Sequence, residues 1–344
     1  MKIPKALCRG DTVVFLAPAS GVAVPAAHRL EQGKSFFESL GYFVEMYPSC
    51  FENGSYSSCD AETRAKDLMR AFEDPAVKAI ICTIGGLTSH EMLEYMDFSI
   101  VAKNPKIFCG FSDITTLHLA IYAQADLVTF YGPSVLCQFG EFPTPLAYTI
   151  DSFFSGVAKP STPIGVVRPS VEWTDDKSVN WFTKADMHTS RPMKQNDAGY
   201  EWLRHGRATG PLLGGCLPVL LNVFGTKYMP STVGSILLLE TPESEEAFDK
   251  GMSLDMVNMH LGVLRANETL RHVRGIAVGR AFAYSAQVDE LKRLILHHTG
   301  GYDYPIVYGI DCGHTDPIAT WPLGVPISLD SHANIISIDG ASVQ

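Results

Sequence analysis

The first half of the chain alternates short apolar runs with longer segments whose apolar residues recur at helical spacing. The apolar runs predict β-strands over residues 11–17, 42–47, 79–84, 106–109 and 128–131, and the helical spacing predicts helices over residues 25–40, 61–73 and 114–124. Gly41 is suited to end the first helix, and Asp60 to cap the second. This alternation indicates a mostly parallel sheet with helices on both faces.

The pattern is lost between residues 160 and 204, where prolines and the tryptophans Trp173, Trp181 and Trp202 follow no sustained period. Loops of this length are usually functional or disordered, and the aromatic content favours a functional loop. Alternation then resumes, with helices predicted over residues 217–224, 246–264 and 285–298, strands over 235–240, 275–281 and 305–310, and a closing hairpin over 325–338.

The length of 344 residues is typical of two domains, each able to bury its own core. We therefore predict an α/β fold with an N-terminal domain over residues 1–160 and an irregular connecting and substrate loop over residues 161–205. A second, smaller α/β domain follows over residues 206–344.

The net charge and the cysteines limit which partners and which cellular compartment can be expected. The formal net charge of −10, without a basic run, argues against a nucleic-acid polymer as partner. None of the eight cysteines forms a C-x-x-C pair, and several lie in apolar runs, as is typical of reduced thiols in a cytosolic protein. The chain shows neither an apolar signal region behind Met1 nor an apolar stretch of roughly 20 residues, so we expect a cytoplasmic protein without a membrane partner.

Ser112 is the first candidate for chemistry. In Gly110-Phe111-Ser112-Asp113 an apolar strand ends, a glycine permits a sharp turn, and a helical pattern begins after the serine. A serine at such a turn exposes its hydroxyl beside helix N-terminal amides, which can stabilise an oxyanion. The alternative is that Ser112 only caps the helix, since the motif is not a full G-x-S-x-G.

Gly85 and Gly86 follow the third predicted strand. Paired glycines let backbone N–H groups face a ligand closely, although an ordinary tight turn would use them as well. Because the carboxyl ends of parallel strands share one edge of a sheet, Gly86 and Ser112 are expected to be neighbours.

A serine nucleophile needs a base. Among the eleven histidines, His314 lies in a loop that follows a predicted strand, where a general base is commonly placed. Cys312, His314 and Asp316 could instead indicate a metal site, but no second histidine or C-x-x-C lies at ligand spacing, so no metal is predicted. Glu240 ends a buried strand and can orient the histidine, whereas Glu243, Glu245 and Glu246 are expected to be solvated charges at a helix start.

Together these pieces resemble the LD-carboxypeptidase family of serine peptidases (peptidase family S66), and within it the MccF-like, microcin C immunity branch. The resemblance spans nearly the whole chain and is carried by Ile84-Gly85-Gly86, Gly110-Phe111-Ser112-Asp113-Ile114-Thr115, Tyr131-Gly132-Pro133, Gly214-Gly215, Leu238-Leu239-Glu240 and Gly313-His314-Thr315.

The resemblance implies a triad of Ser112 as nucleophile, His314 as general base and acid, and Glu240 as its orienting group. It also implies an oxyanion hole made by the backbone amides of Gly86 and Asp113. The site would lie between the two domains, in a chain that is commonly a homodimer. The implied chemistry is amide hydrolysis through an acyl-enzyme, without metal or cofactor.

Two branches of the family differ in substrate. Murein-recycling members release a terminal D-alanine from muropeptides, whereas MccF-like members cleave the amide between an aspartyl group and a modified nucleotide. The long segment around Trp181 favours the MccF-like branch, since this ring could stack on a purine, although it could equally anchor the loop to the core. A non-catalytic binding protein on the same scaffold is the alternative from another class.

Substrate contacts are also expected from Gly85 and from Cys216, which follows the paired glycines 214 and 215. Some immunity proteins have an asparagine at the position of Cys216. A cysteine cannot replace amide hydrogen bonds to a substrate carboxylate, which puts recognition of the aspartyl part in question.

Overall fold

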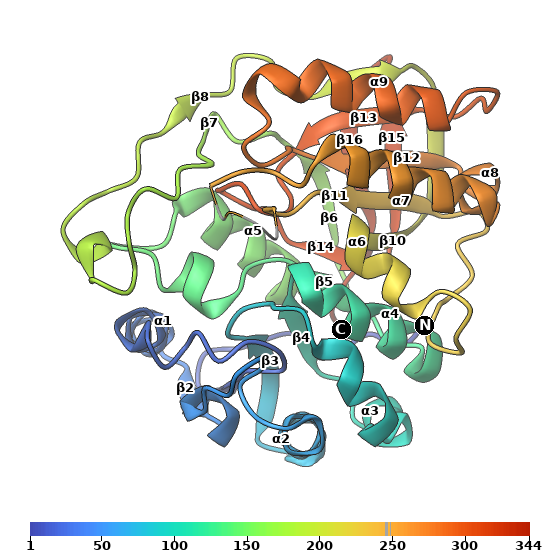
Figure 1. The fold of residues 1–344 in the computed structure, drawn as a ribbon. Helices are drawn as coiled ribbons and strands as arrows, with labels where there is room; N and C mark the ends of the chain where they lie inside the picture. Colours follow the sequence, from blue (N-terminus) through green and yellow to red (C-terminus); the bar gives the residue numbers. More distant parts are fainter. Residues whose placement is uncertain (245–246, 248) are drawn as a thin grey trace.

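The computed structural model describes residues 1–244, 247 and 249–344. Two sheets lie one above the other, the N-terminal one in the lower half of Figure 1 and the second in the upper half. No helix in the described part of the chain is long and apolar enough to cross a membrane.

The N-terminal sheet has six strands in the order β14-β5-β4-β3-β1-β2. Five of them pair in parallel and come from the first half of the chain: β1 (Thr12–Leu16), β2 (Phe43–Met46), β3 (Val77–Cys82), β4 (Ile107–Gly110) and β5 (Thr129–Tyr131). The sixth, β14 (Trp321–Leu323), comes from the C-terminal part and pairs antiparallel with β5. The sheet thus contains the expected parallel strands plus one strand from the other end of the sequence.

Both faces of this sheet are buried. Val13 and Phe15 of β1 belong to one hydrophobic cluster, whereas Val14 and Leu16 belong to another. Such alternation places successive side chains on opposite faces. The faces are covered by α1 (Ala27–Ser39), α2 (Ala61–Glu73), α3 (Phe98–Lys103), α4 (Thr115–Ala125) and α5 (Ala147–Val157).

Local signals set the helix ends as predicted. The Asp60 side chain accepts a hydrogen bond of 2.8 Å from the Thr63 backbone N–H at the start of α2. Gly41, just beyond α1, has φ of 89°, which is the left-handed region that favours glycine. All three predicted helices and all five predicted strands of this half therefore begin and end within a few residues of their expected positions.

The second sheet has eight strands in the order β6-β16-β15-β10-β11-β12-β13-β9. Its centre is parallel, and the other pairs are antiparallel. The strands are β6 (Pro163–Val167), β9 (Glu201–Arg204), β10 (Arg207–Cys216), β11 (Ile236–Glu240), β12 (Gly275–Gly279), β13 (Ile306–Ile310), β15 (Pro326–Asp330) and β16 (Ile335–Ala341).

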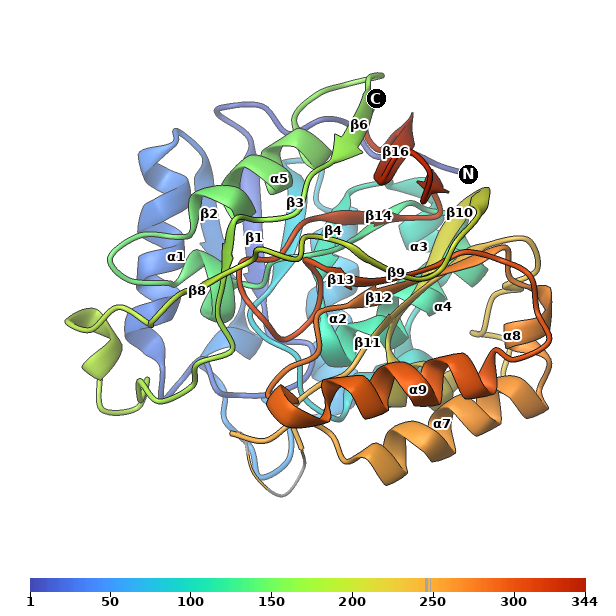
Figure 2. The same cartoon turned by 90° about the horizontal axis from the view of Figure 1, so that it is seen from above.

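The helices of this half are α6 (Leu217–Leu220), α7 (Leu254–Ala266), α8 (Thr269–His272) and α9 (Val288–His298). Helices α7 and α9 lie side by side on the outer face (Figure 2). The helix expected over residues 246–264 begins only at Leu254, where Ser253 caps it, and residues 245, 246 and 248 lie outside the described part. The predicted hairpin near the C-terminus is confirmed as β15 and β16.

The expectation of an irregular segment over residues 161–205 is wrong in part. Its two ends form β6 and β9 at the edges of the second sheet, and β7 (Glu172–Trp173) pairs with β8 (Lys194–Gln195) between them. These strands are short and lie at sheet edges or in a two-stranded ribbon, so they carry no alternating apolar pattern. The rest of the segment lies beside the second sheet, on the left of Figure 1, and reaches down to α1, where Asp186 contacts Arg29.

Candidate active site

Ser112 lies directly after β4, where the chain turns from strand to helix. Its φ of 63° is unusual for a residue with a side chain and costs about 1–3 kcal/mol, so the surrounding structure must hold it in place. The Ser112 side chain does not cap the helical turn that starts there. Its Oγ lies 3.0 Å from His314 Nε2 instead. The structure therefore supports the exposed-hydroxyl interpretation over the capping alternative.

Glu240 and His314 approach from the second sheet. Glu240 ends β11, and His314 lies in the loop after β13. The Glu240 Oε2 atom lies 2.7 Å from His314 Nδ1. Gly313 permits this approach, because a Cβ there would lie 2.6 Å from the same oxygen. The three side chains predicted as a triad are thus joined by hydrogen bonds, although 202 positions separate Ser112 from His314.

Burial and charge set the protonation of this group. Burial lowers the pKa of His314, but the carboxylates of Glu240 and Glu243 outweigh burial, with Lys177 opposing them, and the pKa lies above its ordinary value. A raised pKa makes the imidazole a stronger proton acceptor. The His314 imidazole also packs edge-to-face with the Phe111 ring, with centroids 5.2 Å apart, and this contact holds the orientation of the imidazole.

Tyr131, at the end of β5, was not assigned a role from the sequence. Its hydroxyl donates a hydrogen bond of 2.6 Å to Glu240 Oε1 and accepts one of 3.1 Å from the Ser112 backbone N–H. The side chain therefore connects the strained turn to the buried carboxylate. The Tyr-Gly-Pro motif at positions 131–133 could have indicated this role, because it begins at the last residue of a strand that ends at the same edge of the sheet.

Gly85 and Gly86 lie beside the nucleophile, as the shared edge of the strands predicts. A Cβ on Gly85 would come within 2.9 Å of Ser112 Cβ and 3.1 Å of its Oγ, so only glycine fits there. The Gly85 carbonyl accepts a hydrogen bond from the Ser20 N–H. Because a trans peptide points its carbonyl and N–H in opposite directions, the Gly86 N–H faces away from Ser20.

Asp113 is fully buried, and its carboxylate accepts hydrogen bonds from the backbone N–H groups of Thr88 and Ser89 at 3.0 and 2.9 Å. These contacts tie the turn after Gly86 to the turn after Ser112. Within the described residues, neither the Gly86 nor the Asp113 N–H donates to another backbone group. Both donors are therefore available to a ligand, as an oxyanion hole requires.

The predicted substrate contacts are placed less favourably. The Trp181 ring is partly buried against the core, and the Arg29 guanidinium lies 4.1 Å from its centroid. This arrangement supports the anchoring alternative for Trp181. Cys216 is 1% exposed and lies opposite Glu240 in the β10–β11 pairing, where its buried thiol interacts with the Glu240 carboxylate.

The expectation that Glu243 is a solvated charge at a helix start is wrong. Its Oε2 lies 3.4 Å from His314 Nε2, and its Oε1 lies 3.3 Å from the ammonium of Lys177. Lys177 comes from the segment between β7 and β8, whose contacts no local pattern reveals. In the described part of the chain no group of three or more His, Cys, Asp or Glu side chains could hold a metal ion.

Comparison with known proteins places this geometry in a family. The model of the LD-carboxypeptidase N-terminal domain matches residues 13–132, and that of the LD-carboxypeptidase C-terminal domain matches residues 209–329. The chain belongs to the LD-carboxypeptidase family. As the resemblance in its motifs implies, its relatives include the MccF-like branch.

Two relatives illustrate the match. The chain is 36% identical to Bacillus subtilis YocD, with 92% of this chain and 93% of the relative covered. It is 29% identical to the Escherichia coli microcin C7 self-immunity protein MccF, with 96% and 94% covered. The structure of MccF in complex with aspartyl sulfamoyl adenosine superposes with a TM-score of 0.90 at 27% identity and covers 100% of both chains. The two-domain α/β fold is thereby confirmed, whereas the homodimer and the cytoplasmic location stay predictions.

Proposed function

We propose that this LD-carboxypeptidase family member is a serine peptidase or amidase that hydrolyses the amide bond between an aspartyl or related acyl group and a modified nucleotide. The observation that carries the proposal is the relay from the Ser112 hydroxyl through the His314 imidazole to the Glu240 carboxylate, with contacts of 3.0 and 2.7 Å. The substrate class follows from MccF, which shares the fold and has been solved with aspartyl sulfamoyl adenosine.

In the proposed reaction His314 Nε2 accepts the hydroxyl proton while Ser112 Oγ bonds to the substrate carbonyl carbon. The N–H groups of Gly86 and Asp113 stabilise the negative charge that develops on the carbonyl oxygen. The carbon–nitrogen bond then breaks, and His314 returns the proton to the leaving nitrogen. Water, deprotonated by the same imidazole, hydrolyses the acyl ester on Ser112 and frees the enzyme.

The test is a side-by-side assay with aspartyl sulfamoyl adenosine and an L,D-tetrapeptide, followed by mass spectrometry. We expect cleavage of the nucleotide compound by the wild type and no turnover by Ser112→Ala. Unchanged turnover by Ser112→Ala would end the triad assignment. Cleavage of only the tetrapeptide would show the muropeptide activity instead.

A serine-directed phosphonate probe separates catalysis from binding alone. The proposed enzyme is labelled at Ser112, and the label is lost in Ser112→Ala. A binding protein on the same scaffold would hold the nucleotide compound tightly, release no product and remain unlabelled.

A further inference from the structure

A second carboxylate reaches the nitrogen of His314 that faces the nucleophile. Glu243 Oε2 lies 3.4 Å from Nε2, the same atom that lies 3.0 Å from Ser112 Oγ. The triad does not need Glu243, because Glu240 already holds Nδ1. The backbone of Glu243 is fixed by a bridge to Gly251, and its side chain is 20% exposed. A charged group is therefore held next to the reacting atoms without a part in the proton relay.

Lys177 brings the opposite charge to the same place. Its ammonium lies 3.3 Å from Glu243 Oε1 and 5.3 Å from the centroid of the Phe282 ring. Its side chain is 27% exposed, so both members of the pair are largely removed from water yet reachable. Desolvating a charge is costly, and an ion pair offsets that cost only in part. An ammonium also has three donors, so Lys177 can hold Glu243 and a ligand at once.

Two other described cations near the site are each held by two carboxylates. Arg29 pairs with Glu141 and Asp186, and Arg191 pairs with Glu141 and Asp316. These contacts fasten the loop segment to the N-terminal domain and to the loop of His314. Of Arg29, Arg191 and Lys177, only Lys177 pairs with a carboxylate that also contacts the His314 ring, namely Glu243.

Building on the proposed function, we propose that Glu243 and Lys177 form a subsite for the charged groups of the acyl part. Glu243 binds its ammonium group, and Lys177 binds its carboxylate. The ligand class is an acyl group that carries both a free amino group and a carboxylate, as an aspartyl group does. This subsite supplies the carboxylate recognition that the buried Cys216 cannot provide.

The chemistry favours an acyl group over the nucleotide as the occupant. The scissile carbonyl must lie at Ser112 Oγ, and the aspartyl amino group is attached to the carbon next to that carbonyl. A carboxylate that contacts the imidazole therefore lies within reach of this amino group. Charge-assisted hydrogen bonds in a partly desolvated site are among the stronger polar contacts, so each is expected to contribute to selectivity.

The test compares three compounds: aspartyl, succinyl and alanyl sulfamoyl adenosine. The succinyl compound lacks the amino group, and the alanyl compound lacks the side-chain carboxylate. We expect the wild type to prefer the aspartyl compound about 100-fold in kcat/KM over either analogue, because each analogue lacks one charge-assisted contact with the site. Glu243→Gln is expected to lose most of the preference for the aspartyl over the succinyl compound and to keep the preference over the alanyl compound. Lys177→Met is expected to show the reverse: it loses the preference over the alanyl compound and keeps the preference over the succinyl compound.

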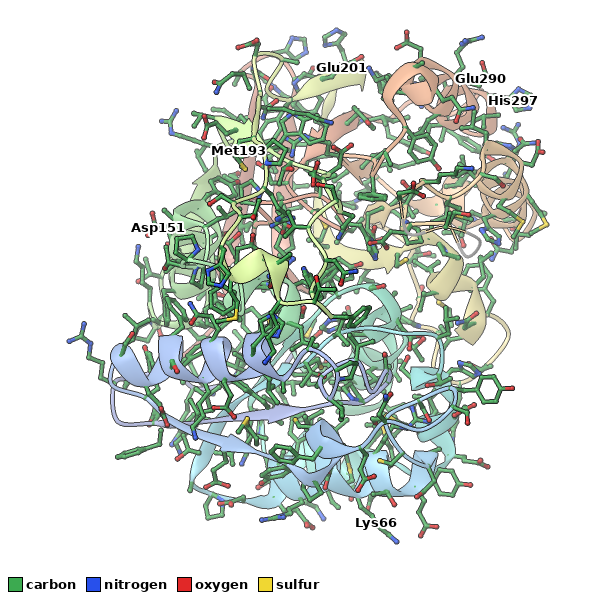
Figure 3. The ribbon with its side chains drawn as sticks, turned by 60° about the vertical axis from the view of Figure 1, so that its left-hand side comes forward. Lys66, Asp151, Met193, Glu201, Glu290 and His297 are labelled. Atoms are coloured by element: carbon green, nitrogen blue, oxygen red, sulfur yellow. The ribbon has the colours of Figure 1, made fainter. Side chains whose placement is uncertain are left out.

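The matched control is the surface ion pair of Glu62 and Lys66 on α2, with side chains 55% and 72% exposed. Lys66 projects from the far end of the N-terminal domain, well away from the segment that carries Met193 (Figure 3). Glu62→Gln and Lys66→Met are expected to keep the wild-type selectivity. Lys177→Arg is expected to retain part of the preference for the carboxylate.

Calorimetric binding of the same compounds to Ser112→Ala separates the subsite from the reaction. If the wild type hydrolyses none of them, the proposed function fails, and the binding pattern in the Ser112→Ala background still decides the subsite. Equal affinity for all three compounds, no binding of any, or unchanged selectivity in both Glu243→Gln and Lys177→Met would overturn the subsite.

Discussion

Replacing Tyr131 by Phe removes one oxygen from the centre of the site. The hydroxyl donates to Glu240 Oε1 at 2.6 Å and accepts from the Ser112 N–H at 3.1 Å. Burial, followed by the charge of Glu240, raises the pKa of Tyr131 well above 10.0, so the hydroxyl keeps its proton and donates at every working pH. Phenylalanine retains the ring and its packing. The substitution therefore isolates the two hydrogen bonds.

The expected magnitude follows from the partners. A hydrogen bond to a charged group contributes about 1.5–3 kcal/mol, and Glu240 is 1% exposed, so water cannot replace the lost donor. We expect the free energy of unfolding to fall by about 1–3 kcal/mol. The strained Ser112 turn loses a restraint as well, so kcat is expected to fall by about 10- to 100-fold.

The pH profile distinguishes positioning from general damage. A carboxylate that no longer accepts from Tyr131 stabilises the imidazolium more strongly, which raises the pKa of His314. The acidic limb of kcat/KM is therefore expected to move to higher pH in Tyr131→Phe, while circular dichroism shows a folded protein. Wild-type kcat together with an unmoved limb would refute this account of Tyr131.

Three further outcomes are expected. Gly85→Ala places a methyl group against the Ser112 side chain, so turnover should drop at least 100-fold, and near wild-type turnover would contradict the close approach. Glu243→Gln removes a carboxylate that raises the pKa of His314, so the acidic limb of kcat/KM should move to lower pH, and an unmoved limb would contradict the contact. Burial lowers the pKa of His118 from 6.5 to about 4. As the pH falls, the unfolded chain therefore takes up a proton on this imidazole before the folded protein does. The free energy of unfolding should decrease by about 3 kcal/mol between about pH 6.5 and about pH 4. Denaturant titrations across this range should show a smaller decrease in His118→Gln, and an equal decrease would assign the effect elsewhere.

Local sequence patterns predicted much of the N-terminal half because its strands and helices are regular and buried. Asp60 and Gly41 mark helix ends by their own side chain or backbone, independently of distant contacts. Ser112 could be found for the same reason, since a strand, a glycine and a helix follow one another within a few residues. The shared edge of parallel strands then brought Gly85 next to it.

Strand β10 shows why other elements were not predicted. It contains Gly210, Pro211, Gly214 and Gly215, which are residues typical of turns. The structure uses them differently: a Cβ on Gly214 would collide with the Leu238 carbonyl of the neighbouring strand, and one on Gly215 would lie 2.6 Å from Thr115 Oγ1. These glycines are required by neighbours far away in the sequence.

The sequence by itself determined the residue types of the site, the strand ends that carry them and the class of fold, because these depend on patterns a few residues long. Tertiary structure alone decided that β14 joins the first sheet, that Tyr131 bridges Ser112 to Glu240, and that Lys177 and Glu243 meet at His314. Those contacts join residues from both domains and from the segment between them. Contacts between strands and loops that are far apart in the sequence are set by the packing of the whole chain. A local pattern of apolar and polar residues therefore cannot predict them.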